Sequence, residues 1–307
     1  TVTVRHGGET TVETYDKLLL ATGSQPVLPA LPGSDSGRIF PFWTIPDMDQ
    51  VMAQIDAGAR TAVVVGAGFI GLEVAENLRQ RGLEVTIVEL ASQVLPTIDP
   101  EMSSYLAYEL MNDGITLRLG CKVTAFDRTD GHAVILDDGG RIPADLVMMC
   151  VGIRPNSELA RNAGLQLGPL GHIVVDRNLR TSDPDIFAAG DVIEVVDPVT
   201  GMPTAVPLAG PANKQGRIVA DNIAGGDSAY AGTYGATVIK VGRLAAAAVG
   251  LTERRLQQLH VDYRKIYTHP GSNASYYPGG SLLHMKLLFA PDGKILGAQA
   301  VGKSADK

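Results

Sequence analysis

A glycine-rich turn between an apolar run and an acidic residue constrains this chain more than any other feature. Val63 to Val65 is a β-branched run, typical of a strand buried on both faces. The residues that follow carry glycines on the G-x-G-x-x-G spacing, namely Gly66, Gly68 and Gly71. This spacing allows a tight turn, a close approach of backbone to a diphosphate, and close contact between helix and strand. Because the next helix would direct its free N–H groups at that anion, the pattern predicts a dinucleotide site.

A second strand pattern supports this interpretation. Residues 83–89 form an apolar run that ends in Glu89, whose carboxylate can accept hydrogen bonds from an adenosine ribose. Glu89 would repel a 2′-phosphate, and residues 90–93 contain no Lys or Arg, so we predict NAD(H) rather than NADP(H). In the alternative interpretation, Glu89 is only the solvated end of a strand.

The composition excludes several classes of protein. The 307 residues are 45% hydrophobic and 19% charged, which is typical of a globular protein with two or three domains. The net charge of −7 argues against nucleic acid or an anionic membrane as partner. Cys121 and Cys150 lie far apart and form no C-x-x-C motif, which excludes a disulfide framework and favours a reducing cytoplasm. The histidines are scattered and show no metal-ligand spacing.

The remaining patterns predict the arrangement of elements. Helix and strand patterns alternate over residues 61–152, which predicts an α/β unit with a largely parallel sheet. Within it, Asp99 is expected to cap a helix with Pro100 at its first position. After about residue 231 the pattern predicts antiparallel strands. Thr252 is expected to cap a short helix among them. The strands predicted there are residues 237–241, 261–267, 282–289 and 295–301.

Two further strands end in residues that suit a flat ligand. Residues 18–21 read as a buried strand that closes on Thr22-Gly23, where a backbone can pass close to such a ligand. Residues 185–191 form another strand, and Asp191 would lie at its carboxyl end, where open α/β sheets bind ligands. The Asp191 carboxylate could hold the hydroxyls of a sugar-like chain. A Pro-rich loop over residues 24–46 reads as a crossing between domains.

With these motifs in this order, the sequence resembles the flavin-dependent pyridine nucleotide–disulfide oxidoreductases. Ala21-Thr22-Gly23 is similar to the family's A-T-G strand, and residues 185–191 are similar to its second flavin motif. The resemblance implies that Asp191 binds the ribityl chain of FAD and that a helix opening at about Pro211 directs its dipole at the flavin. The FAD-binding residues it implies are Ala21, Thr22, Gly23, Gly190, Asp191, Pro207, Leu208, Ala209 and Ala212. The NAD-binding residues it implies are Gly66, Gly68, Phe69, Ile70, Gly71, Glu73, Glu89 and Gly152.

Within the family, the sequence is most similar to the coenzyme A-disulfide reductases and their persulfide-reductase and NADH-oxidase-like relatives. The stretches that carry this resemblance are 66–78, 206–209, 211–213, 276–279 and 297–302. In that branch the last domain dimerises and supplies aromatic hydroxyls to the partner's active site, which makes Tyr276 or Tyr277 the substrate-side candidate. The alternative is a pair of surface or core tyrosines. Glu73 matches a family position near the nicotinamide, and it could equally lie on a solvated helix face.

The sequence departs from the family pattern in two respects. The family's first flavin-binding glycine turn and its redox cysteine would both lie before Thr1, and neither Cys121 nor Cys150 matches a redox position. Cys150 lies in an apolar strand and is expected to be inert packing. We therefore expect the chain to be part of a longer protein that is truncated here at both ends. We also expect the chain alone to hold flavin weakly or not at all and to show no reductase turnover.

The resemblance implies an α/β fold in which a Rossmann-like NAD(H)-binding domain, residues 46–152, is inserted into a partial FAD-binding domain of the same kind. Residues 1–45 and 153–228 would form the FAD-binding segments, and 229–307 an incomplete α+β dimerisation domain. The implied function is the transfer of hydride from NADH through flavin to a cysteine-based disulfide. The small-molecule substrate would be a disulfide or persulfide, coenzyme A-linked in this branch, and the protein a cytoplasmic homodimer without metal. The alternatives are an NADH oxidase or peroxidase of the same family, and a non-catalytic fragment that binds nucleotide and dimerises.

Overall fold

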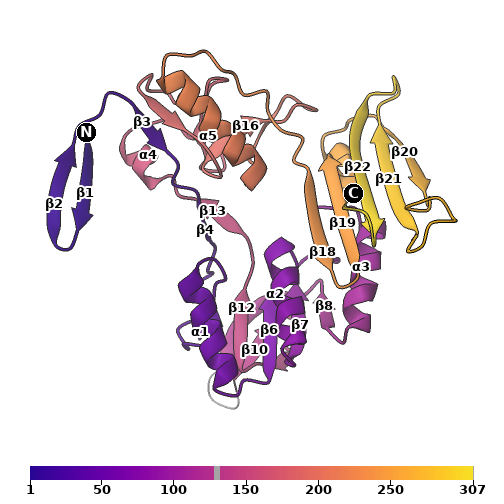
Figure 1. Cartoon of the computed structure of the whole chain (residues 1–307). Helices are drawn as coiled ribbons and strands as arrows, with labels where there is room; N and C mark the ends of the chain where they lie inside the picture. Colours follow the sequence, from indigo (N-terminus) through magenta and orange to yellow (C-terminus); the bar gives the residue numbers. More distant parts are fainter. Residues whose placement is uncertain (128–131, 307) are drawn as a thin grey trace. The chain divides into compact units, whose positions relative to one another are not determined.

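Two compact units make up the computed structural model of this chain (Figure 1), which describes residues 1–127 and 132–306. The first unit contains Thr1–Gln25 and Arg154–Gly235, and the second contains Pro26–Ile153 and Ala236–Lys307. Residues 128–131 and 307, which fall in the predicted nucleotide-binding and dimerisation segments, lie outside the described residues. The chain passes between the units three times: within β4 (Ser24–Pro26), within β13 (Ile153–Pro155) and after Gly235.

The central sheet of the second unit is parallel, as predicted. Its order is β5 (Ile39–Phe40), β12 (Leu146–Met149), β6 (Thr61–Val65), β7 (Glu84–Glu89) and β8 (Thr116–Leu119). Every neighbouring pair runs in the same direction. The carboxyl ends of β6, β7 and β8 therefore meet at one edge of the sheet.

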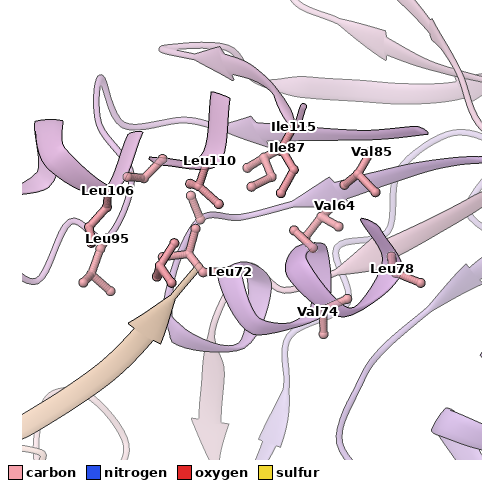
Figure 2. Close-up of a cluster of buried hydrophobic side chains, with 14 of the residues drawn as sticks. Val64, Leu72, Val74, Leu78, Val85, Ile87, Leu95, Leu106, Leu110 and Ile115 are labelled. Carbon is pink, nitrogen blue, oxygen red and sulfur yellow. The ribbon is translucent and has the colours of Figure 1, made fainter. Parts of the chain in front are cut away.

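Alternation along β6 separates two buried layers. Val64 joins the core formed with α2 (Phe69–Gln80) and α3 (Pro100–Asn112), and Figure 2 shows its neighbours there. Val63 and Val65 join a second cluster on the opposite face. That cluster is completed by an antiparallel sheet of β9 (Val123–Asp127), β10 (Ala133–Leu136) and β11 (Arg141–Pro143). Burial on both faces accounts for the continuous β-branched run in the sequence.

The Pro-rich segment contains helix α1 (Ile45–Asp56), which was not predicted from the sequence. Pro46 lies in its first turn, where a missing backbone N–H costs no intrahelical bond. The Asp47 carboxylate accepts a hydrogen bond from the Thr44 N–H at 2.7 Å, as in a capping box. Part of the predicted crossing loop is therefore a capped helix.

The C-terminal part of the second unit is an antiparallel sheet, as predicted. Its order is β18 (Thr237–Val241), β19 (Leu244–Gly250), β22 (Ile295–Gly302), β21 (Leu283–Phe289) and β20 (Arg264–Thr268). Strand β19 was not predicted, because the alanines of 245–248 have low strand propensity. Ile239, Ala246 and Val301 belong to the same buried cluster as α2 and α3. This sheet and the nucleotide-binding part of the unit therefore share one core.

A buried cation holds the two parts of the second unit together. Lys286 of β21 has a fully buried side chain, and its Nζ lies 2.8 Å from Asp99, 2.5 Å from Glu101 and 2.6 Å from Glu253. Burial opposes ionisation of Glu253, but hydrogen bonds from Lys265, Lys286 and Tyr263 hold its pKa at about 2. Asp99 and Glu101 come from the start of α3, whereas Glu253 begins α6 (Glu253–Gln258).

Asp99 occupies the predicted N-cap position of α3, but its carboxylate does not cap that helix. It accepts instead from the backbone N–H of Glu253 at 3.0 Å and from the Gln299 amide at 2.7 Å. The prediction of a side-chain cap is wrong here, because buried donors from the C-terminal sheet and from α6 compete for the carboxylate. Thr252 does cap α6 as predicted, since its hydroxyl accepts from the Arg255 N–H.

The first unit is smaller and contains two short sheets beside a hairpin. The hairpin is β1 (Val2–His6) with β2 (Glu9–Glu13). Strand β3 (Leu18–Leu20) pairs in parallel with β15 (Ile186–Ala188), and a second sheet contains β14 (Ile173–Val174), β16 (Ile193–Val196) and β17 (Pro203–Thr204). Leu20 is buried but Leu19 is 37% exposed, so the prediction of a fully buried strand is wrong at that residue.

The two helices of the first unit are α4 (Glu158–Asn162) and α5 (Ala209–Ile223). Phe187 of β15 and Val219 of α5 belong to the same buried cluster, which fixes α5 beside that strand. Among the described residues of the whole chain, no helix combines the length and apolar character needed to cross a membrane.

Candidate functional site

A cleft of about 470 Å³ lies at the carboxyl edge of the parallel sheet in the second unit. Gly66, Gly68, Glu89 and Gly152 all line it, although they come from three different strand ends. The structure thus brings together four of the residues predicted to hold NAD(H). The rest of the lining is largely apolar and includes Val65, Leu90 and Met149.

The three glycines of the turn have different physical roles. Gly66 has a φ of +103°, and a Cβ there would lie 2.3 Å from the Cys150 carbonyl oxygen. A Cβ on Gly71 would lie 2.0 Å from the Gly66 carbonyl oxygen, so this glycine allows helix and turn to touch. A Cβ on Gly68, in contrast, would meet no protein atom within 4 Å. The protein itself needs Gly66 and Gly71, whereas the open space at Gly68 is where a ligand can approach the backbone.

The amino end of α2 suits an anion. Gly68 is its N-cap and offers no side-chain acceptor, and the first turn holds no acidic residue. The N–H groups of the first turn, which includes Phe69 and Ile70, are therefore not satisfied by a capping side chain, and no acid within that turn offsets the positive end of the helix dipole. A diphosphate at this position would supply both the acceptors and the charge.

Glu89 is held directly over the glycine turn. Its Oε2 accepts from the Ala67 N–H at 2.6 Å, and its Oε1 accepts from the Ala91 N–H at 2.8 Å. The side chain is half-buried, and each carboxylate oxygen keeps a further lone pair for a ribose hydroxyl. These contacts favour the binding interpretation over a freely solvated strand end.

The lining residues that sequence reasoning missed include a thiol and a cation on the cleft wall. Cys121 and Lys122 line the cleft from the segment after β8, which ends beside β7. The only available signal was the alternating apolar pattern of residues 115–119, which is typical of a strand. In a parallel sheet the end of such a strand would lie near Glu89. The sequence argument for NAD(H) considered only residues 90–93 as a source of positive charge, and Lys122 lies outside that segment.

Cys150 also lines the cleft, at the end of β12. Burial raises the pKa of its thiol to about 12, so the thiol is protonated at neutral pH. This agrees with the expectation that Cys150 is inert packing. Among the described residues both cysteines are free thiols.

Glu73 lies on the exposed face of α2 and does not line this cleft. It borders a separate hollow of about 310 Å³ together with Phe42, Met48 and Met52. Its predicted place near a nicotinamide stays a prediction.

In the first unit, the two predicted flavin motifs meet at one sheet edge. Leu20 of β3 is opposite Ala188 of β15, so both strands end together. Beyond them, the Ser24 hydroxyl donates to the Asp191 carboxylate at 2.8 Å. Gly23 has a φ of +65°, and a Cβ there would meet no atom within 4 Å, which leaves its backbone accessible. Thr22 donates from its hydroxyl to the Asn156 carbonyl at 2.6 Å, which anchors the turn.

Helix α5 approaches the same edge. It begins at Ala209, two residues before the predicted start at Pro211. A Cβ on Gly190 would lie 3.7 Å from the Cβ of Ala212, and the Gly190 N–H donates to the Gln215 amide oxygen at 2.8 Å. The N-cap Leu208, which follows Pro207, has no polar side chain, and the first turn holds no acid. The positive end of α5 therefore lies beside Gly190-Asp191, as the flavin prediction requires.

Tyr276 and Tyr277 lie on the segment between β20 and β21 and are 83% and 60% exposed. Their ring centroids are 5.2 Å apart. The interpretation as core tyrosines is wrong. Their exposure leaves both hydroxyls free to meet a ligand, and the substrate-side role stays a prediction.

Comparison with known proteins identifies the family of this arrangement. Residues 1–216 match the family described as pyridine nucleotide-disulphide oxidoreductase, and residues 237–307 match the dimerisation domain of the same family. The chain belongs to the pyridine nucleotide-disulphide oxidoreductases. This confirms the predicted family and fold class, and members of the family depend on FAD and NAD(P)H. The predicted choice of NAD(H) over NADP(H) stays a prediction.

Individual members of the family are similar to this chain over nearly its whole length. An NADH oxidase of Methanocaldococcus jannaschii is 37% identical over 290 residues, which cover 94% of this chain and 64% of that protein. A coenzyme A disulfide reductase of Staphylococcus epidermidis is 32% identical and covers 100% of this chain and 70% of that protein. The structure of an NAD-dependent persulfide reductase from A. fulgidus matches with a TM-score of 0.96 and 34% identity, over 98% of this chain and 56% of that one. The chain thus spans roughly three fifths of the length of two of these relatives.

Proposed function

We propose that this chain forms the nucleotide-binding and dimerising part of an FAD-dependent oxidoreductase that uses NADH to reduce a disulfide or persulfide. The observation that carries the NADH side is the Glu89 carboxylate, fixed over the glycine turn beside the uncapped start of α2. The acceptor is proposed by similarity, because relatives across nearly the whole chain are named coenzyme A disulfide reductase and persulfide reductase.

The residues of the second unit would bind and orient the nucleotide. The backbone at Gly66 and Gly68 and the start of α2 would bind the diphosphate, and Glu89 would accept from the ribose hydroxyls. A 2′-phosphate would add negative charge next to Glu89, which supports NADH over NADPH. Lys122 lies on the same cleft wall, and its positive charge would attract a 2′-phosphate and so favour NADPH. We therefore expect a preference for NADH that is measurable but not absolute.

The residues of the first unit would hold the flavin. Asp191, oriented by Ser24, offers acceptor oxygens for the ribityl hydroxyls, and Gly23 leaves room for the ring system. The start of α5 offers positive potential where negative charge collects on the reduced ring. When bound, FAD supplies the two-electron chemistry between a nicotinamide and a thiol couple.

The substrate side would use the exposed phenols of Tyr276 or Tyr277, which can donate a hydrogen bond to a sulfur or a thiolate. The match to the dimerisation domain supports a homodimer in which these hydroxyls serve the partner's site. Two free cysteines and the lack of a disulfide among the described residues support a reducing, cytoplasmic location.

Calorimetric titration of the chain with NADH and NADPH tests the nucleotide assignment. We expect NADH to bind at least tenfold more tightly, and Glu89→Ala to abolish that preference. Equal affinity for both nucleotides in the wild-type chain would refute the role of Glu89.

Acceptor assays on the FAD-loaded oxidoreductase of which this chain is proposed to form a part test the reaction. NADH oxidation should be faster with coenzyme A disulfide or a persulfide than with oxygen, and Tyr276→Phe or Tyr277→Phe should lower the disulfide-dependent rate. Faster turnover with oxygen would favour the NADH oxidase relative. Nucleotide binding and dimerisation without turnover, measured with a sizing column, would favour the non-catalytic alternative.

A further inference from the structure

Two histidines that are separated in sequence lie side by side on adjacent strands of the C-terminal sheet. His269 directly follows β20, and His284 lies in β21. Thr268 is opposite Met285 in the strand register, so the next opposed pair is His269 and His284. Their Nδ1 atoms are 3.0 Å apart. Sequence spacing held no sign of this pair, because only the antiparallel register brings the two rings together.

The short distance between the two nitrogens restricts their protons. Both Nδ1 atoms cannot carry a proton toward each other, so at least one lone pair points at the other ring. When both rings carry their proton on Nε2 instead, both Nδ1 atoms present a lone pair, and these atoms lie 3.0 Å apart. For metal–nitrogen bonds of about 2.0–2.1 Å, the 3.0 Å separation corresponds to a bond angle at the metal of about 91–97°. That is the cis angle of tetragonal and octahedral ions such as Ni²⁺ and Cu²⁺, not the wider tetrahedral angle.

The surroundings favour a neutral, oriented His284. The His284 ring stacks on Tyr105 of α3, with centroids 4.0 Å apart and planes inclined by 18°, which fixes its direction. Burial, together with the charge of His269, lowers the pKa of His284. His269 is exposed, so water can complete the coordination of an ion.

We propose that His269 and His284 form a binding site for a divalent transition-metal ion of the Ni²⁺ or Cu²⁺ type, completed by water. Among the described residues, one group of three metal-ligating side chains is found, Asp99, Glu101 and Glu253, and the Lys286 ammonium already occupies it. The histidine pair closes the base of the segment that carries Tyr276 and Tyr277. A bound ion would therefore link the two strands and order that segment. This inference does not depend on the proposed reaction.

Calorimetric titration of the untagged chain with NiCl₂ at pH 7.5 tests the site. We expect one ion per chain, and at least a tenfold loss of affinity in His269→Gln and in His284→Gln. His6→Gln, which removes an exposed histidine in the β1–β2 hairpin, is the matched control and should bind as the wild type does. Circular dichroism and NADH affinity report whether the variants are folded.

Hydrogen exchange provides a second readout. Ni²⁺ should slow exchange of the amides in residues 270–282 in the wild-type chain and have no effect in His284→Gln. Binding that is undetectable, or that is unchanged in both variants while they remain folded, would overturn the proposal and leave the pair as two hydrogen-bonded imidazoles.

Discussion

Replacing Lys286 by Met should destabilise the second unit far more than removing an exposed lysine from the same cluster. The Lys286 side chain is fully buried and pairs with three carboxylates, of which Asp99 is 1% and Glu253 14% exposed. Loss of the ammonium removes the cation shared by the three carboxylates and leaves Glu253 with only the exposed Lys265 as a counterion. Removing one partner of a buried ion pair typically costs about 3–5 kcal/mol. Because Glu101 is 41% exposed and can be solvated, we expect the lower end of this range, about 3 kcal/mol.

Lys265→Met is the matched control, since it removes the same charge from the same carboxylate. Lys265 lies 2.8 Å from Glu253, but its side chain is 45% exposed. After screening by solvent, such a pair contributes about 0–1 kcal/mol. The assay is urea unfolding followed by the fluorescence of Trp43, the one tryptophan of the chain, which lies in the second unit. If both variants lost the same free energy of unfolding, the argument from burial would be refuted.

The pH dependence supplies an independent check on this reasoning. The pKa of Glu253 is about 2 in the folded chain, below its ordinary value of 4.5. Its contribution to stability is therefore present above pH 4.5 and is lost as the pH falls toward 2. In Lys286→Met that pKa is lowered less, so the variant has less stability to lose. The difference in unfolding free energy between wild type and variant should shrink between pH 4.5 and 2.

Three further predictions concern the nucleotide cleft. Gly68→Ala should unfold within about 1 kcal/mol of the wild type, because an added Cβ meets no protein atom, yet lose at least tenfold in NADH affinity by calorimetry. Gly71→Ala should be clearly less stable to urea, because its Cβ would lie 2.0 Å from a carbonyl oxygen; wild-type stability would contradict the close contact between helix and turn. Cys150 should stay unmodified by iodoacetamide in the native chain at pH 8, because a thiol with a pKa of about 12 is almost fully protonated, and mass spectrometry of the digested chain would show any labelling.

The sequence predicted those features whose cause is local. The turn at Gly66, the acid at Glu89 and the acid Asp191 were readable because each needs a particular residue at a particular offset from a strand. The predicted strand over 185–191 was too long, because β15 ends at Ala188 and Asp191 lies three residues beyond it. Strand β19 was not readable, because its alanines are recruited by pairing with β18 and β22 and not by their own propensity.

Side-chain partners from distant segments were equally hidden. Asp99 looked like a helix cap, and its position was right, but its carboxylate is taken by Glu253 and Gln299. Lys122 reaches the cleft, and His284 reaches His269, only through strand order and register. Local propensity does not contain that information.

The placement of Asp99 has a practical consequence for anyone who recombines members of this family. Its carboxylate belongs by sequence to the nucleotide-binding segment but serves groups contributed by the C-terminal sheet and α6. A chimera that exchanges only the C-terminal portion would keep Asp99 and discard its matched lysine and glutamine. A chimera that folds should therefore take Asp99, Lys286 and Gln299 from the same parent, even though nearly two hundred positions separate the first from the others.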